Sequence, residues 1–463
     1  MAKEARGEVN VHMSPLLARV EGFVRRLLAE PERARRGYPV VLLLLTLAVW
    51  FPALFAGLDV TNPDSFYHIT QAALHHSPSD VADWFVRGYW AYTHYEYRPL
   101  TRVSLLLDYL VWGRRPLGFH LTNVLLHFVC AAVLAAAMVR MGAPVWAARL
   151  TGALAVVFPQ GQMAVTWING RQDVLCAALA LGAVLLLLNW LAGRPWPHLV
   201  GAAALTFLSA LAKEPGAVTP MFMLAAALLV PTQRRLRTRL LAVALIAAPL
   251  GLYGFLRLQA WPMDQYVKQN ANQLRPLAVS VDKYFGEVLA PRLHELWFLW
   301  RRMGIHVAFS PRFPRLFVEQ VAFWAGLVVL LRRHRRLLAL ALVWKTAFFL
   351  PVHNLYWNPA FTHYRYLPHF GTVWLAGLAA WELSAYAAAR MRRQMQTAAR
   401  WSLVALGLLV LIGYYYRQIE LKWPDRALLL KGGARPPAAF CRSLQGPEVP
   451  FDFGDEAGAS PEQ

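Results

Sequence analysis

Long apolar runs separated by short polar segments dominate the pattern of hydrophobic and polar positions in this chain. A helix that crosses the hydrocarbon core of a bilayer needs about 20 mostly apolar residues. Eleven runs reach or approach that length, at residues 38–57, 118–139, 143–158, 174–192, 197–212, 216–231, 240–257, 318–331, 337–351, 367–389 and 401–416. The pattern predicts an all-α integral membrane protein, a polytopic helix bundle with about 11 transmembrane helices. The shorter runs are also compatible with broken or re-entrant helices that face protein.

The composition supports a membrane location. Of 463 residues, 57% are hydrophobic and only 16% are charged, which excludes a chain built of ordinary soluble domains. The 47 Lys and Arg residues exceed the 26 Asp and Glu residues and give a formal net charge of +21. In a soluble protein this charge would suggest a nucleic-acid partner, whereas here we attribute it to loop topology and expect no nucleic acid. The three cysteines, Cys130, Cys176 and Cys441, predict no disulfide framework.

The distribution of Lys and Arg predicts the orientation in the membrane. If the N-terminus is cytoplasmic, the inner segments hold 23 of these residues in 76 positions, and the outer segments hold 23 in roughly 200 positions. The positive-inside rule assigns the denser set to the cytoplasm. We therefore expect the two largest loops, 58–117 and 258–317, on the outer face. The predicted organisation is a cytoplasmic amphipathic segment (1–37), a transmembrane domain (38–416) and a partly disordered, non-cytoplasmic polar tail (417–463).

The first large outer loop mixes aromatic with charged residues. Its aromatic residues include Trp84, Phe85, Tyr89, Trp90 and Tyr92. Acidic and basic side chains lie between and beside them, a pattern typical of an amphipathic helix at a membrane surface. We expect the large outer loops to carry interfacial helices, and this one to form a roof over the bundle.

Polar residues collect in the outer loops and at the outer ends of the apolar runs. The five groups are Thr61–His68, Tyr97–Thr101, Trp167–Asp173, Ala212–Glu214 and His353–Tyr366. Ionisable groups at membrane depth are costly unless they are paired or serve a site, so groups confined to one side predict a cavity at the outer leaflet. A transporter usually needs polar residues near the midplane, and these runs are mostly Ala, Leu and Val.

The carboxylates and cations in these groups suit transfer of a sugar from a phospholipid carrier. Cations can hold the phosphate leaving group, and a carboxylate can take the proton of an acceptor hydroxyl. Asp64 is the best candidate for that base, and its alternative role is to cap a turn after Pro63. One carboxylate without a second nucleophile favours a single inverting displacement.

Each candidate cation also has a structural alternative. Arg171 and Asp173 could cap a helix and pair with each other. Lys213 could be a snorkelling side chain, and Arg365 could be an interfacial anchor. The histidines of the first loop match no standard zinc spacing, so no metal site is assigned, and the need for a divalent cation stays open.

An ordered set of motifs resembles a known family of membrane enzymes. The first block comprises Tyr97–Thr101, Leu107–Tyr109, Gly118–His120, Asn123–His127, Trp167–Asp173 and Ala212–Glu214. The second block comprises Leu350–Pro351 with Asn354, and Tyr366–Pro368 with Gly371. Together they closely resemble the characteristic run of the GT-C type O-mannosyltransferases, which carry transmembrane spans followed by tetratricopeptide repeats, and of their bacterial relatives. The resemblance covers about residues 59–375.

This resemblance implies a GT-C type glycosyltransferase that takes a sugar from a polyprenyl-phosphate donor on the non-cytoplasmic face. We expect this protein in a bacterial inner membrane, with its active site on the periplasmic face. The resemblance makes Asp64 the catalytic carboxylate. It implies that the donor phosphate is bound by Arg98, Arg171, Lys213 and Arg365, with support from Tyr97, Asp173, Glu214, His353 and Asn354.

Two positions depart from the family pattern. Asp64-Ser65 stands where the family has an acidic pair. Thr362-His363 stands where the family has an acidic residue and an arginine, and Arg365 is displaced by two positions. This sequence carries no tetratricopeptide repeats, so the acceptor stays open among a protein, a lipid and a glycan. The alternatives are a lipid or solute transporter and a noncatalytic membrane partner with the family fold.

Overall fold

The computed structural model describes residues 31–55, 69, 72–86, 97–157, 162–260, 324–353 and 363–389. Every regular element within these ranges is a helix, which confirms the predicted all-α class. The α-helices are α2 (Pro31–Leu54), α4 (Pro78–Val86), α5 (Pro99–Trp112), α6 (Pro116–Arg140), α7 (Val145–Val157), α8 (Gln162–Thr166), α9 (Arg171–Leu191), α10 (Pro197–Ala212), α11 (Thr219–Leu229), α12 (Leu236–Ala247), α13 (Pro249–Ala260), α18 (Arg335–Phe349) and α19 (Tyr366–Ala389). The 3-10 turns are η2 (Ile168–Gly170), η3 (Glu214–Val218), η5 (Arg332–His334) and η6 (Leu350–Val352).

Four helical stretches in the described ranges are long and apolar enough to cross a membrane. They are Gly37–Leu54, Pro116–Arg140, Ile168–Leu191 and Leu236–Ala260. Three further apolar helices are shorter, at Val145–Val157, Pro197–Ala212 and Glu214–Leu229. The chain therefore has the helices of a membrane protein, but the predicted count of about 11 spans is not confirmed. The predicted run at 401–416 lies outside the described residues.

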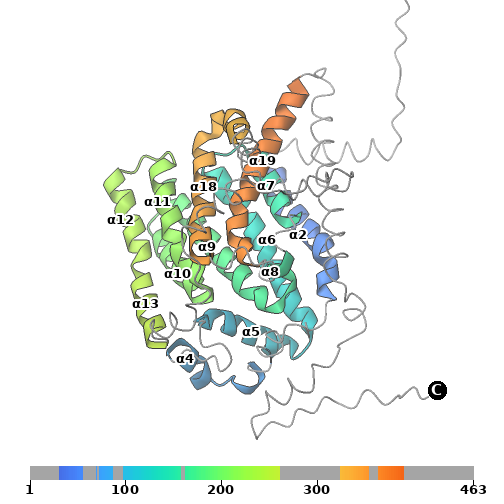
Figure 1. Cartoon of the computed structure of the whole chain (residues 1–463), viewed down its shortest axis with the longest axis vertical. Helices are drawn as coiled ribbons and strands as arrows, with labels where there is room; N and C mark the ends of the chain where they lie inside the picture. Colours follow the sequence, from blue (N-terminus) through green and yellow to red (C-terminus); the bar gives the residue numbers. More distant parts are fainter. Residues whose placement is uncertain are drawn as a thin grey trace, which may run out of the picture.

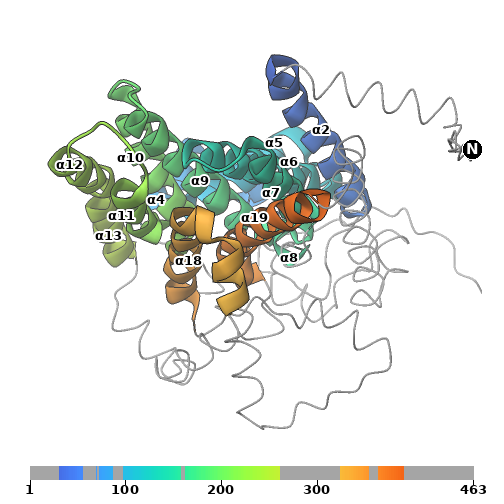
Figure 2. The same cartoon turned by 90° about the horizontal axis from the view of Figure 1, so that it is seen from above.

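Helix α9 occupies the centre of the bundle and packs against α6 on one side and α10 on the other. Its buried face contains Ala177, Ala180 and Ala183, each fully buried. Small side chains let helix backbones approach closely, which is how van der Waals packing drives association between membrane helices. Figures 1 and 2 both show α12 and α13 at one edge of the bundle and α2 at the other.

The two edges of the bundle present large apolar side chains to the surroundings. Leu245, Leu252 and Phe255 on α12 and α13 are 57%, 53% and 58% exposed. Val41 and Leu44 on α2 are similarly exposed, at 50% and 61%. Large apolar patches on a protein surface mark contact with lipid or with another protein. In a bundle with helices of this length, we interpret them as the lipid-facing surface.

Helices α4 and α5 lie across one end of the bundle, beside the end where α9 begins (Figure 1). Helix α4 confirms a short helix near Trp84 in the first large loop, and Trp84 is buried, with 4% exposure. Helix α5 was not predicted as a separate element. Its first residue is Pro99, whose missing N–H costs nothing at a helix start. The Tyr97 hydroxyl donates to the Phe85 carbonyl at 2.6 Å and so joins the two helices.

The arginine-rich turns lie at the opposite end of the bundle. Helix α9 runs from Arg171 to a turn that contains Arg194, and α10 returns from that turn. Arg234, in the next turn at the same end, donates to the carbonyls of Trp190 at 2.8 Å and Arg194 at 3.0 Å. The bundle therefore has one end with arginine-rich turns and another end that holds Arg98, Lys213 and the first turn of α9.

These two ends predict opposite labelling by a membrane-impermeant thiol reagent. Arg114 and Gln233 are both exposed and lie at the two ends, and the native Cys130 and Cys176 are buried. In a Cys441→Ser background, Arg114→Cys should be labelled from outside intact cells, because the positive-inside rule places the arginine-rich turns in the cytoplasm. Gln233→Cys should be labelled only after the cells are opened. Labelling of Gln233→Cys from outside would contradict the predicted orientation.

Candidate functional site

Three consecutive polar residues in the first turn of α9 reach three different parts of the fold. Arg171, Gln172 and Asp173 are 0%, 3% and 1% exposed. Successive side chains of an α-helix point about 100° apart, since there are 3.6 residues per turn. Arg171 reaches α5 and α6, Gln172 reaches Arg98 just before α5, and Asp173 reaches Lys213 at the end of α10. This turn thus links three segments that meet at the same end of the bundle.

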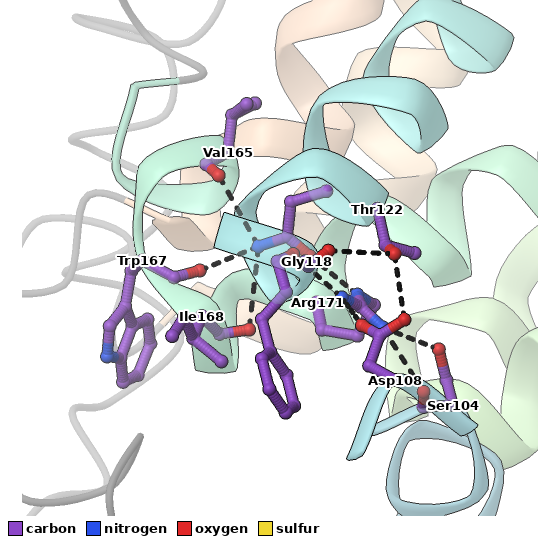
Figure 3. A network of polar contacts seen from close by, with 10 residues as sticks. Ser104, Asp108, Gly118, Thr122, Val165, Trp167, Ile168 and Arg171 are labelled. Atoms are coloured by element: carbon purple, nitrogen blue, oxygen red, sulfur yellow. Dashed lines mark hydrogen bonds and ion pairs between the residues drawn. The ribbon is translucent and has the colours of Figure 1, made fainter. Parts of the chain in front are cut away.

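Arg171 is held in a buried network that uses all of its guanidinium nitrogens (Figure 3). Its Nη2 donates to Asp108 Oδ2 at 2.5 Å and to the Phe119 carbonyl at 2.9 Å. Its Nη1 donates to the Ser104 hydroxyl at 2.7 Å, and its Nε donates to Asn123 Oδ1 at 2.5 Å. A fully paired and fully buried guanidinium fixes helices α5, α6 and α9 relative to one another.

This network changes the interpretation of Arg171. The sequence left open a pair between Arg171 and Asp173, but the two residues pair with different helices, because positions two apart do not face each other on a helix. The predicted role of Arg171 in binding the donor phosphate gains no support from this arrangement, since its donors already have protein acceptors. The geometry favours a structural role for Arg171.

A second group of charges, the cationic cluster, comprises Arg98, Lys213 and Arg257 with their carboxylate partners. Arg98 donates from Nε at 3.0 Å and from Nη2 at 2.8 Å to Glu214 Oε2, and from Nη1 to Gln172 Oε1. The other Glu214 oxygen lies 3.5 Å from Arg257 Nη1. Glu214 therefore stands between two arginines from segments far apart in the sequence.

Lys213 forms the deeper part of the cationic cluster. Its Nζ donates to Asp173 Oδ1 at 2.6 Å, and both side chains are 1% exposed. The ring of Tyr364 lies over the ammonium group, with 4.5 Å from Nζ to the ring centroid, which is a cation–π contact. The pKa of the neighbouring His363 is held well below its usual value, chiefly by burial and also by Lys213 and Arg98. His363 is therefore neutral at pH 7 and leaves the positive charge to the cluster.

The other predicted site residues lie in different places. Tyr97 supports the start of α5 through its bond to α4, and burial raises its pKa to about 12, so its hydroxyl stays a donor. Arg365 is buried beside Tyr364. Its role in binding the donor phosphate stays a prediction. His353 forms a hydrogen bond with the Leu350 carbonyl in its own turn, at 2.8 Å, and its predicted supporting role stays a prediction. Two predicted residues lie outside the described residues: Asp64, the predicted base, and Asn354, a predicted supporting residue.

Several residues of the site were not proposed as site residues from the sequence. They are Asp108, Asn123, Trp167, Gln172, Arg257, His363 and Tyr364. Asp108 had an available signal, because a carboxylate inside an apolar helix needs a partner, and Arg171 offers one. Arg257 had no such signal, since only the fold brings it to Glu214. Among the described residues, no group of three His, Cys, Asp or Glu side chains is arranged to hold a metal ion.

Comparison with known proteins gives a partial match to O-mannosyltransferases. Protein O-mannosyl-transferase Tmtc1 of Drosophila melanogaster is 36% identical over 129 residues, which cover 26% of this chain and 14% of that protein. Protein O-mannosyl-transferase Tmtc2 of the same organism is 34% identical over 129 residues, with the same coverage. No family model and no solved structure matches the chain. The similarity supports a relationship to glycosyltransferases over a part of the sequence.

The buried Arg171 network predicts a large loss of stability when its charge is removed. Arg171→Gln should lower the free energy of unfolding by about 3 kcal/mol or more, because Asp108 would remain buried without a countercharge. The thermal midpoint of the detergent-solubilised protein would report this loss. The double variant Arg171→Gln/Asp108→Asn should recover a part of it.

Arg237→Gln is the matched control, because Arg237 is exposed at the far end of the bundle. It should leave the midpoint unchanged. A midpoint for Arg171→Gln equal to that of Arg237→Gln would show that the network does not stabilise the fold.

Proposed function

We propose that this chain is a membrane glycosyltransferase that moves a sugar from a polyprenyl-phosphate donor to an acceptor hydroxyl on the non-cytoplasmic face. The observation that carries the proposal is the cationic cluster at the end of the bundle opposite the arginine-rich turns. The partial similarity to O-mannosyltransferases supports the reaction class and suggests mannose as the first sugar to test. A GT-C type fold and the carrier lipid are parts of this proposal.

The most accessible part of the cluster suits a phosphate group. The Glu214 side chain is 26% exposed and the Arg257 side chain 20%, whereas those of Lys213 and Asp173 are 1% exposed. A phosphate oxygen and a carboxylate oxygen make the same charge-assisted bonds to a guanidinium. The donor phosphate would take the place of Glu214 on Arg98, while Glu214 remains beside Arg257. Lys213 would add positive charge from below.

The proposed reaction breaks the bond between the sugar's C1 and the phosphate oxygen and forms a bond between C1 and the acceptor oxygen. The acceptor oxygen attacks the sugar's C1 while Asp64 takes the acceptor proton, and the bond from C1 to the phosphate oxygen breaks with its electron pair on the phosphate. Arg98 and Lys213 would stabilise the negative charge that builds on that leaving group. A single displacement of this kind inverts the configuration at C1.

The proposed phosphate site predicts opposite effects of two substitutions on donor binding. Arg98→Gln should weaken binding of polyprenyl monophosphate by about tenfold or more, because a charge-assisted hydrogen bond is lost. Glu214→Gln should bind the lipid at least as tightly as the parent, because its carboxylate no longer competes for Arg98. Binding of the lipid to the full chain in nanodiscs is the measurement. Weaker binding by Glu214→Gln than by Arg98→Gln would exclude this site.

The proposed base predicts a difference between two nearby carboxylates. Asp64→Asn keeps the shape of the side chain and removes the base, so sugar transfer should fall by about 100-fold or more while lipid binding is retained. Asp59→Asn should keep most of the activity, since Asp59 stands at the end of the first apolar run without a matching role. Transfer from a defined polyprenyl-phosphate donor in membranes is the measurement. Full turnover by Asp64→Asn would remove the proposed mechanism.

A further inference from the structure

The segment from α8 to η2 contains buried polar atoms that have no hydrogen-bond partner among the described residues. They are Trp167 Nε1, Asn169 Oδ1 and Gln162 Nε2. Trp167 and Gln162 are 8% exposed, and Asn169 is 3% exposed. Burying a polar atom without a partner is costly, so native proteins pair such atoms with protein, water or ligand. A donor, Trp167 Nε1, and an acceptor, Asn169 Oδ1, thus lie only two residues apart, and neither has a hydrogen-bond partner among the described residues.

The backbone of the same segment is fixed from its other side. Asn123 Nδ2 donates to the carbonyl of Trp167 at 2.9 Å and to that of Val165 at 3.3 Å (Figure 3). Arg171 in turn holds Asn123 through its Oδ1. Gly170 closes the segment at a point where a Cβ would lie 2.3 Å from the Ala164 carbonyl oxygen, so only glycine fits. The segment is pre-organised, while Trp167 Nε1 and Asn169 Oδ1 have no partner within the part of the chain that the structure describes.

The position of Trp167 relates this segment to the cationic cluster. Its ring lies against His363, with 5.1 Å between the ring centroids. The next residue, Tyr364, covers the ammonium group of Lys213. A continuous row thus leads from Trp167 through His363 and Tyr364 to Lys213. In a polyprenyl-phosphate sugar, the sugar ring is joined to the phosphate through a single oxygen, so the two groups bind only a few ångströms apart.

We propose that the Trp167–Asn169 segment binds the hydroxyl groups of the sugar carried by the lipid donor. This inference rests on the proposed function, because it needs a phosphate at the cationic cluster. A sugar hydroxyl both donates and accepts, so it can accept from the Trp167 indole N–H, and it or a neighbouring hydroxyl can donate to Asn169 Oδ1. Asn123 and Arg171 act as positioning residues for this segment.

The test compares two lipids that differ only in the sugar. One is a polyprenyl monophosphate, and the other is the same lipid carrying mannose on its phosphate. The affinity of the full-length protein in nanodiscs is measured for each. Trp167→Phe keeps an aromatic ring and removes the N–H, so it should weaken binding of the mannosyl lipid by about fivefold or more. Binding of the sugar-free lipid should not change.

Asn169→Ala tests the acceptor half independently and should have the same selective effect. Trp196→Phe is the matched control, because Trp196 is 69% exposed at the far end of the bundle. The thermal midpoint of each variant separates a loss of binding from a loss of folding. If Trp167→Phe destabilises the protein, Asn169→Ala still shows whether the segment binds the sugar.

Two results would overturn the inference: equal losses for both lipids, or no loss for either lipid. The first result would assign the segment to the fold or the phosphate, and the second, if it came with a raised acceptor KM, would assign the segment to the acceptor. Arg98→Gln distinguishes these results from failure of the proposed function. If Arg98→Gln does not weaken binding of either lipid, the phosphate site itself is absent.

Discussion

The end of the bundle that holds the candidate site depends on the partners of its buried charges. A charge at membrane depth is costly, and removing one member of a buried pair leaves the other without compensation. The first turn of α9 meets this constraint by directing Arg171 and Asp173 to partners on different segments, Asp108 and Lys213. Each pair joins α9 to another helix. The charges are therefore compensated only when these helices pack together. The small side chains of α9 then allow its neighbours to approach closely.

Arg171 and Arg98 lie at the same end of the bundle but in different environments. They differ in the groups that surround their guanidinium nitrogens. Arg171 is fully buried, and its nitrogens contact a carboxylate, a hydroxyl, an amide and backbone carbonyls, which leaves no position for a ligand. Arg98 shares Glu214 with Arg257, and Glu214 is the most exposed carboxylate of the cluster. An anion can exchange with a partly exposed carboxylate far more easily than with a buried network. The burial and the saturated hydrogen bonds of Arg171 favour a structural role for it, whereas the partly exposed partner of Arg98 makes Arg98 the better candidate for binding an anion.

The sequence predicted the helices better than it predicted the contacts between them. Apolar runs located α6, α9, α10 and α19 within a few residues, because each helix must bury or expose a continuous apolar surface. The pairing of Arg171 with Asp108 was not predicted, because these residues are 63 positions apart and their meeting depends on how α5 crosses the end of the bundle. Arg98 and Lys213 were correctly expected to lie at the same end. The role of Asp64 stays a prediction, since it lies outside the described residues.

The Arg171 network connects the stability of the fold with the candidate site. Arg171 orients Asn123, and Asn123 holds the carbonyls of the segment that carries Trp167. The same guanidinium also fixes α5, whose preceding residue Arg98 lies in the cationic cluster. The Arg171 network thus sets the relative positions of the cationic cluster and of a segment whose buried Trp167 Nε1 and Asn169 Oδ1 have no partner among the described residues. Because both depend on it, a substitution at Arg171 would disturb ligand binding without any contact between Arg171 and the ligand. Loss of activity in such a variant would therefore not identify Arg171 as a phosphate ligand.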